Sequence, residues 1–271
     1  GGDFAAGFVV TLAAATVAPA VLVTLRALGA EVGARRAAPF LVLTPAAVFM
    51  AVSAVAVFAA FAAWGLAAIA LAAASIRPSR LVGWAVVSGL LLGCCVELSY
   101  GLPLLGVLAL GVLVAARSWK PLPVAAVAAL VPVLALAAMG FAWWDAYPVL
   151  VERYDLGVAK DRPASYWWWG DLGALLISAG PVLGAGLAVW LVRLRSGADR
   201  VVLVLVAAGV LTIALADASG MSKGEVERIW LPFIPWLTLS LALLPPRWRS
   251  RALGLQVVTA LLVQHLLYTS W

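Results

Sequence analysis

The chain has 271 residues, of which 65% are hydrophobic and only 11% are charged, and its mean hydropathy is +1.10. A soluble domain carries about a quarter charged residues, so the composition argues against a soluble enzyme, a nucleic-acid-binding domain, a disordered tail or a coiled coil. The remaining class is a polytopic membrane protein, in which the net charge of +6 reflects basic residues in the connecting loops.

Taken in chain order, eight apolar runs qualify as candidate membrane crossings, since a bilayer core needs about 20 apolar residues per helix. They are Phe4–Leu25, Pro39–Ser75, Leu81–Ala116, Leu122–Ala142, Leu172–Val192, Val201–Ala216, Ile229–Leu244 and Ala252–Leu267. The second and third runs would each be more than about 50 Å long as single helices. We predict a break near Pro45 and Ser53 in one, and at Ser99–Pro103 in the other. The chain is then one all-α domain over residues 1–271, a polytopic transmembrane bundle of about ten helices with several short or broken.

The basic residues support these two breaks. Thirteen of the 18 Lys and Arg residues lie in five short segments between the predicted crossings. The segments hold Arg26, Arg35 and Arg36; Arg77 and Arg80; Arg117 and Lys120; Arg193, Arg195 and Arg200; and Arg247, Arg249 and Arg251. With ten crossings all five segments lie on one face, which the positive-inside rule makes cytoplasmic. We therefore expect a multi-pass plasma-membrane protein with both chain ends on the non-cytoplasmic face.

The longer of two loops expected on the opposite face runs from about Trp143 to Asp171 and contains eight Trp or Tyr residues. One interpretation is an interfacial aromatic belt, which membrane proteins commonly have. The other is a carbohydrate- or lipid-binding platform, with Tyr154 and Tyr166 stacking on the ligand and Asp145 and Asp171 binding its hydroxyl groups.

The second loop, residues 217–228, is small and polar at first and then densely charged. Its last residues include Lys223, Glu225, Glu227 and Arg228. We expect a helix to start at Glu225, with Glu225 and Arg228 on one face, and Pro232 and Pro235 to interrupt the helix that follows. The run is explained either by helix capping with a local salt bridge, or by cations that hold a lipid phosphate beside a carboxylate base. Arg162, from the first loop, is likewise either a phosphate ligand or part of an interfacial salt bridge.

Few other residues suggest chemistry. Glu97 lies within a predicted membrane segment, where an acidic residue has either a functional or a hydrogen-bonding role. His265, in the last run, is interpreted as a packing residue. The sequence has no Gly-rich phosphate loop, metal-ligand cluster or Ser-His-Asp arrangement.

Three stretches, residues 44–65, 154–174 and 222–236, resemble actinobacterial integral-membrane glycosyltransferases of the GT-C fold, a group that includes methylthioxylose and mannosyl-type transferases. The sequence SKGEVERIWLPFIPW at 222–236 is the most specific of the three. The resemblance runs from about Leu25 to Trp236. Val55 departs from it, because we expect Asp there, and Asp171 stands where relatives tend to have Asn.

The resemblance implies transfer of a sugar from a polyprenyl-phosphate donor to a cell-envelope glycan acceptor on the non-cytoplasmic face. Membrane lipid and lipid-linked sugar are the implied partners, nucleic acid is not, and no cofactor within the chain is implied; metal dependence stays open. The expected catalytic residues are Glu225 and Glu227, the donor-phosphate residues Arg228, Arg162 and Lys223, and the sugar- or lipid-contacting residues Tyr154, Tyr166, Asp145 and Asp171.

Enzymes of this fold place a catalytic Asp in a first extracytoplasmic loop that follows an initial helix, and the sequence starting at Gly1 is expected to lack both. Two other functions are therefore kept. One is a transporter or flippase for a lipid-linked solute, which Glu97 and the broken helices favour. The other is a non-catalytic membrane scaffold related to such enzymes.

Overall fold

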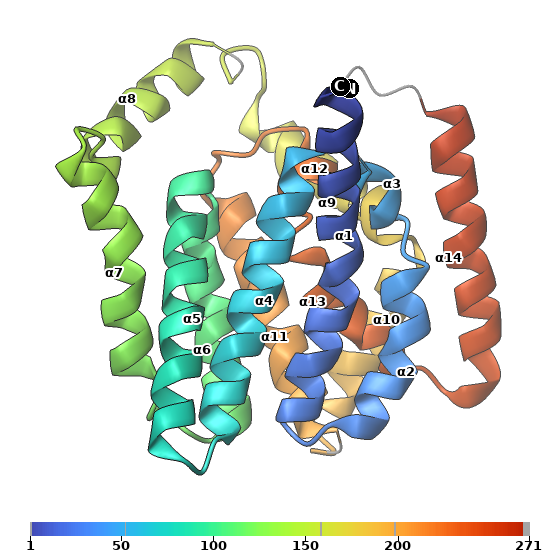
Figure 1. Cartoon of the computed structure of the whole chain (residues 1–271). Coiled ribbons are helices and arrows are strands. Elements are labelled where there is room, and N and C mark those ends of the chain that lie inside the picture. The colour runs from blue at the N-terminus through green and yellow to red at the C-terminus, as the bar shows by residue number, and fades with distance from the viewer. Residues whose placement is uncertain (1, 52, 158, 198, 268–271) are drawn as a thin grey trace.

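The computed structural model describes residues 2–51, 53–157, 159–197 and 199–267, and the regular elements in these ranges are all helical (Figure 1). The α-helices are α1 (Gly2–Ala27), α2 (Glu31–Val42), α3 (Ala46–Met50), α4 (Ala54–Ala74), α5 (Pro78–Leu98), α6 (Leu105–Ala116), α7 (Leu122–Ala138), α8 (Trp143–Leu156), α9 (Ala164–Ala179), α10 (Val182–Arg193), α11 (Arg200–Ala218), α12 (Val226–Ile229), α13 (Ile234–Thr238) and α14 (Pro246–Leu266). Two short 3₁₀ helices, η1 (Leu102–Leu104) and η2 (Leu239–Leu243), complete the described part of the chain.

The helices agree with a multi-pass membrane protein. Within the described residues, α1, α4, α5 and α11 are each long and apolar enough to cross a bilayer. The bent pairs α7–α8 and α9–α10, which turn by 76° and 101°, raise the number of candidate spans to six if each pair is one span. The all-helical architecture is thus confirmed for the described residues, and the four to six candidate spans are consistent with a multi-pass membrane protein. The larger number of crossings stays a prediction.

The predicted breaks in the two overlong runs are confirmed. The first run divides into α2, α3 and α4, with Pro45 at the start of α3 and Ser53 capping α4 by accepting a hydrogen bond from the Val55 N–H at 3.3 Å. The second divides between α5 and α6, where the N–H of Leu102 bonds to the Ser99 carbonyl at 3.0 Å. In both places local turn bonds satisfy backbone groups that a continuous helix would have paired.

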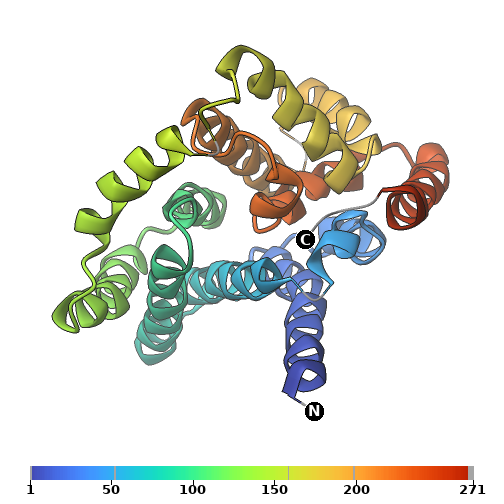
Figure 2. The same ribbon diagram turned by 90° about the horizontal axis from the view of Figure 1, so that it is seen from above.

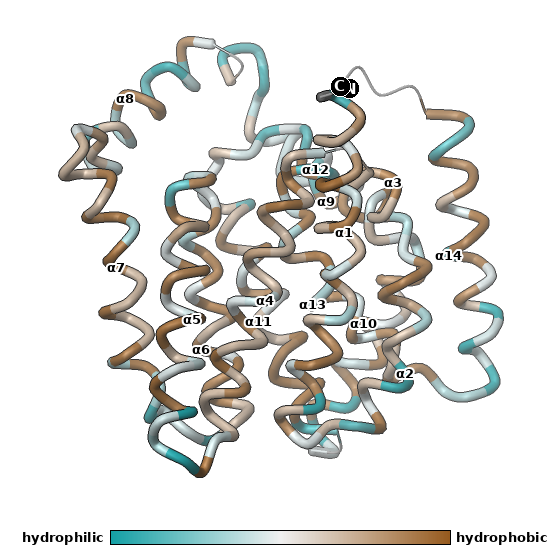
Figure 3. Tube along the Cα trace, in the orientation of Figure 1, coloured by the Kyte–Doolittle hydropathy of each residue, from teal (hydrophilic) through white to brown (hydrophobic). Residues whose placement is uncertain are grey.

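Several of the basic segments lie together at the lower end of Figure 3, where hydrophilic colour gathers at the turns between helices. Asp199 lies 3.0 Å from Arg193 and 4.0 Å from Arg36, which links α2 to the α10–α11 connection. Arg200 donates hydrogen bonds to the carbonyls of Ala115 at 3.0 Å and Val114 at 2.8 Å, at the C-terminus of α6. The grouping agrees with the predicted common face of these segments, and its assignment to the cytoplasm stays a prediction.

Two expectations about local structure were wrong. The region expected as a long loop from Trp143 to Asp171 is largely helical, because it forms α8 and the first half of α9. In α8 the half-buried Trp143, Tyr147, Leu150 and Tyr154 recur at helical spacing, so three of the eight aromatic residues of this region lie on one face of an amphipathic helix.

The run Leu172–Val192, expected as one continuous helix, is broken between α9 and α10 at Gly180, whose φ is +87°. A Cβ there would lie 1.7 Å from Gln256 Oε1, and Gln256 Nε2 donates to the Ala179 carbonyl at 2.8 Å. This buried side chain from α14 therefore fixes the bend and requires glycine at its corner.

The bundle core is built from small residues that let helices approach closely. Helix α4 packs against α1 and α5, and α5 packs against α7, as the view from above shows (Figure 2). A Cβ on Gly89 would lie 2.3 Å from the Ala125 carbonyl oxygen, and one on Gly93 would lie 2.3 Å from that of Ala129. The pair Gly89–Gly93 is thus a close-contact motif of the small-xxx-small kind.

We predict that Gly93→Ala destabilises the bundle because the added methyl group must push the α7 backbone away from α5. Overpacking of this kind costs about 1–3 kcal/mol. The measurement is thermal unfolding in detergent. The matched control is Gly83→Ala in the same helix, where a Cβ meets no atom within 4 Å. Equal unfolding midpoints for the two variants would contradict the close approach of α5 and α7.

Candidate functional site

The two regions chosen from the sequence meet at the upper end of the bundle in Figure 1, where α9, α12 and α3 lie together. One is the connection from α8 to α9, and the other is the connection from α11 to α12. Side chains from the first region hold the peptide backbone of the second at Lys223 and Gly224. We call the group formed by Tyr154, Arg162, Asp171, Lys223 and Gly224 the polar junction.

Three hydrogen bonds define the polar junction. The N–H of Lys223 donates to Tyr154 Oη at 2.8 Å, and the N–H of Gly224 donates to Asp171 Oδ1 at 2.9 Å. Arg162 Nη1 donates to the Lys223 carbonyl oxygen. Each partner lies more than 50 positions from Lys223 or Gly224 in the sequence. Each bond ends on a backbone group of the second region, so none of the three uses the Lys223 side chain.

Arg162 is further fixed by an aromatic ring. Its Cζ lies 5.2 Å from the centroid of the Trp167 ring, and the Trp167 ring meets Tyr166 edge-on at 5.3 Å. A guanidinium has five N–H groups in a rigid fork. One is used on the Lys223 carbonyl, so stacking on Trp167 orients the remaining donors without consuming them.

The backbone of the second region turns sharply to reach the polar junction. Gly224 has a φ of +85° and Glu225 a φ of +61°, both in the left-handed region. A Cβ on Gly224 would lie 2.7 Å from Arg162 Nη1 and 3.1 Å from Trp167 Cζ3. Gly224 therefore meets two requirements, a left-handed conformation and the close approach of an arginine.

The expected helix start after the turn is confirmed, although α12 has only one turn before Trp230. Glu225 and Arg228 share a face as expected, with Glu225 Oε2 at 2.5 Å from Arg228 Nη2. The two side chains are 40% and 31% exposed, so solvent screens this pair and it adds little stability. The predicted interruption at Pro232 is present, since α13 begins only at Ile234, whereas Pro235 lies in the first turn of α13 and does not interrupt it.

Glu227, like its neighbour Glu225, is half-buried. Burial raises the pKa of Glu227, and the charge of Glu225 raises it further, while Arg228 and Arg162 oppose the shift. A carboxyl group with a raised pKa near two arginines has the character of a proton-accepting group in a mixed-charge site.

The placement of the remaining predicted residues differs. Asp171 is buried inside the polar junction with only 2% of its surface exposed, so its role there is at least to hold the Gly224 N–H. Tyr166 lies at the edge of the junction and is 64% exposed. Asp145 is exposed near the start of α8, more than two turns from Tyr154, and the structure does not bring it to the junction.

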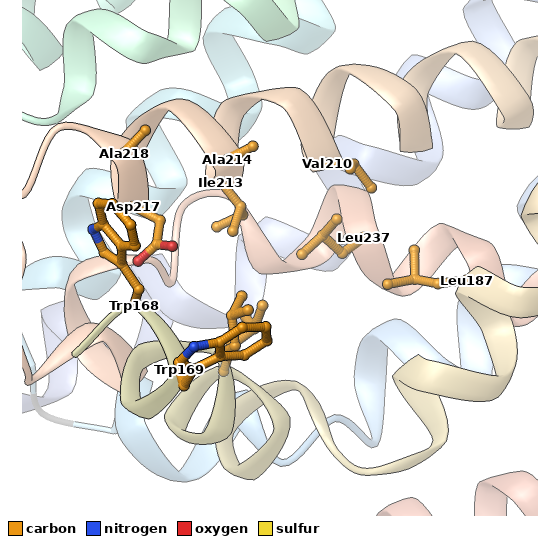
Figure 4. Close-up of a pocket in the computed structure, with 11 residues that line it drawn as sticks. Trp168, Trp169, Leu187, Val210, Ile213, Ala214, Asp217, Ala218 and Leu237 are labelled. Carbon is orange, nitrogen blue, oxygen red and sulfur yellow. The ribbon is translucent and has the colours of Figure 1, made fainter. Parts of the chain in front are cut away.

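Asp217 was not among the site residues chosen from the sequence. It lies in the last turn of α11 and borders an apolar pocket of about 470 Å³ beside the polar junction (Figure 4). Its Oδ1 atom is buried and has no hydrogen-bond partner within the protein. The sequence signal was the single acidic residue ending an otherwise apolar helix.

A cluster of three aromatic rings lies between the turn that follows α5 and the start of α8. The Trp143 and Tyr147 rings stack at 5.3 Å, and Tyr100 lies 5.4 Å from Trp143 and 5.8 Å from Tyr147. Three residues before Tyr100, both carboxylate oxygens of Glu97 are buried without a hydrogen-bond partner. The structural hydrogen bond considered for Glu97 is therefore absent from the described part of the chain.

No group of three or more His, Cys, Asp or Glu side chains in the described residues is arranged to hold a metal ion. Comparison with protein-family models, with curated proteins and with solved structures gave no match to this chain. The functional argument therefore depends on the polar junction and its surroundings.

We predict that Gly224→Ala disrupts the polar junction, because the added methyl group displaces the Arg162 side chain. The expected result is a lower unfolding midpoint and faster tryptic cleavage after Lys160, two residues before Arg162, measured by mass spectrometry. The control is Gly220→Ala, which has a similar φ of +67° but whose Cβ would meet only Lys223 Cε at 4.0 Å. An equal decrease of the unfolding midpoint in both variants would mean that backbone strain alone explains the effect.

We also predict a pH dependence of stability from Glu227. A carboxyl group whose pKa is raised on folding stabilises the protein below its unfolded pKa, and this contribution is lost as pH rises through the folded pKa. Glu227→Gln removes this titration. The stability of the wild-type protein relative to Glu227→Gln should therefore fall as the pH is raised above 4.5, the ordinary pKa of a glutamate, as measured by unfolding in detergent. A difference that does not change with pH would exclude the buried environment of Glu227.

Proposed function

We propose that this protein is a membrane glycosyltransferase that moves a sugar from a polyprenyl-phosphate donor to a cell-envelope acceptor. The observation that carries the proposal is the joining of the α8–α9 and α11–α12 connections into one site. It gathers cationic side chains beside buried carboxyl groups at the end of an apolar helical bundle. Asp217 and Glu227 each lie within electrostatic range of Asp171, and Arg162 lies within range of Asp171 and Glu227.

The charges suit the chemistry of glycosyl transfer. The acceptor oxygen forms a bond to the anomeric carbon, the bond from that carbon to the phosphate oxygen breaks, and the acceptor proton passes to a carboxylate. Cations stabilise the polyprenyl phosphate as it leaves. Arg228 and the free donors of Arg162 would bind the phosphate, with Lys223 beside them, because arginine forks match phosphate oxygens.

Between the two expected catalytic carboxyl groups, Glu227 fits the base better than Glu225. Glu225 forms a close ion pair with Arg228, so its carboxylate is already engaged by a cation. Glu227 has a raised pKa from burial, so it holds a proton near neutral pH more readily than an exposed glutamate. Glu225 then serves to position Arg228, and the sugar would lie against Tyr154 and Tyr166.

A transporter of lipid-linked solutes is a second candidate, supported by the unpartnered carboxylate of Glu97 in the membrane helix α5. It is distinguished by the product. A transporter moves the lipid-linked sugar across sealed vesicles without forming a glycosidic bond, and Glu97→Gln should abolish that movement.

We predict that Arg228→Ala lowers sugar transfer by at least about 100-fold, the size of effect seen when a single charge-stabilising group is removed from an active site. Transfer is measured in membranes supplied with a panel of radiolabelled polyprenyl-phosphate hexoses and pentoses. Arg153→Ala is the control, since Arg153 is exposed on α8. Full activity of Arg228→Ala, with wild-type transfer demonstrated, would exclude the assigned role of Arg228.

A further inference from the structure

The pocket beside Asp217 lies between four helices. Its walls come from α9, α10, α11 and α13, and Asp217 is the one charged residue among those that line it. Figure 4 shows Asp217 and Trp168 at one end and Leu187 at the other, with Val210 and Ile213 between them. The pocket is therefore long and apolar, with a single carboxyl group at one end.

The register of α11 creates this arrangement. Val210, Ala214 and Asp217 are four and three residues apart, so they lie on one face of the helix, and Asp217 is about 10 Å from Val210 along the axis. Trp169 and Leu237 close the pocket from the opposite side. An extended hydrocarbon chain fits this shape, since the walls offer it only apolar contact along most of its length.

The charge at the end decides which head group is accepted. Asp217 lines the pocket, and its buried Oδ1 has no hydrogen-bond partner within the described residues, so the carboxyl group lacks part of the hydrogen bonding it would have in water. No Lys or Arg side chain lines the pocket. A phosphate placed at Asp217 would bring two negative charges together in an apolar setting, and such like-charge contact costs several kcal/mol. A hydroxyl group instead donates its proton to the carboxylate.

We infer that this pocket binds the acceptor, a membrane lipid alcohol whose hydroxyl group donates a hydrogen bond to Asp217 and whose chain lies toward Leu187. The assignment to the acceptor rests on the proposed glycosyl transfer, whereas binding of a lipid alcohol does not. In this arrangement the two substrates are separated by charge. The donor phosphate lies at the arginines beside the polar junction, and the uncharged acceptor lies at Asp217. The electrostatic link between Asp217 and Asp171 places the acceptor hydroxyl next to the junction.

The test is photolabelling of the purified full chain in nanodiscs with a diazirine-bearing dodecanol. Labelled peptides should come from α9 and α11. Unlabelled dodecanol should compete at least about tenfold better than dodecyl phosphate, because the phosphate meets Asp217. Equal or better competition by dodecyl phosphate, or competition by dodecylamine without competition by dodecanol, would overturn the inference.

Two variants locate the site. Asp217→Asn keeps the shape and removes the charge, so it should reduce the discrimination against dodecyl phosphate to within about threefold. Leu187→Trp should fill the far end of the pocket and cut labelling at least about fivefold. The matched control is Leu211→Trp on the exposed face of α11, which does not line the pocket and should label normally. Unchanged labelling in Leu187→Trp would show that the probe binds elsewhere.

The outcome is separable from that of the proposed function because labelling requires no transfer. Selective labelling without any sugar transfer would support the lipid-alcohol site and contradict the proposed glycosyltransferase activity. Sugar transfer without selective labelling would support the glycosyltransferase activity and contradict the binding of the acceptor in this pocket.

Discussion

The backbone at Lys223 and Gly224 is the point on which the upper end of the molecule depends. Its peptide groups are bound by Tyr154, Arg162 and Asp171, which come from two other helical regions. Buried peptide groups outside helices must find partners. Here three side chains supply them, and the same bonds fix the distance between the two charged regions. The polar junction is thus first a requirement of the fold. Its capacity for chemistry depends on the charged side chains that lie beside these backbone bonds.

The fold could be predicted from the sequence where the signal was local. Proline and serine marked the interruptions before α4 and α6, and the spacing of Glu225 and Arg228 gave their ion pair. The bend at Gly180 could not be predicted, because it depends on Gln256 from a helix 77 residues later. Helix α8 was missed because its dense aromatic residues are typical of an interfacial loop as well as of one face of a helix.

The site was predictable in composition but not in arrangement. The charged residues at 223–228 and Arg162 stood out as clusters, and the tertiary fold joined them. Asp217 gave almost no signal, since one acidic residue at a helix end is common. What distinguishes it is an unpartnered carboxylate oxygen at the end of an apolar pocket, and that depends on how α9 and α13 pack against α11.

The two ends of the bundle use their charges differently. At the lower end Asp199 is matched by Arg193 and Arg36, so the charged groups there satisfy one another and act as connectors. At the upper end Asp217 carries a buried oxygen that the protein does not pair. A buried polar atom without a partner lowers stability, whereas a ligand that pairs with it gains the bond the protein lacks. The position of the unpaired group, beside a fixed junction of arginines and carboxyl groups, is therefore the strongest physical reason to place substrate recognition at this end.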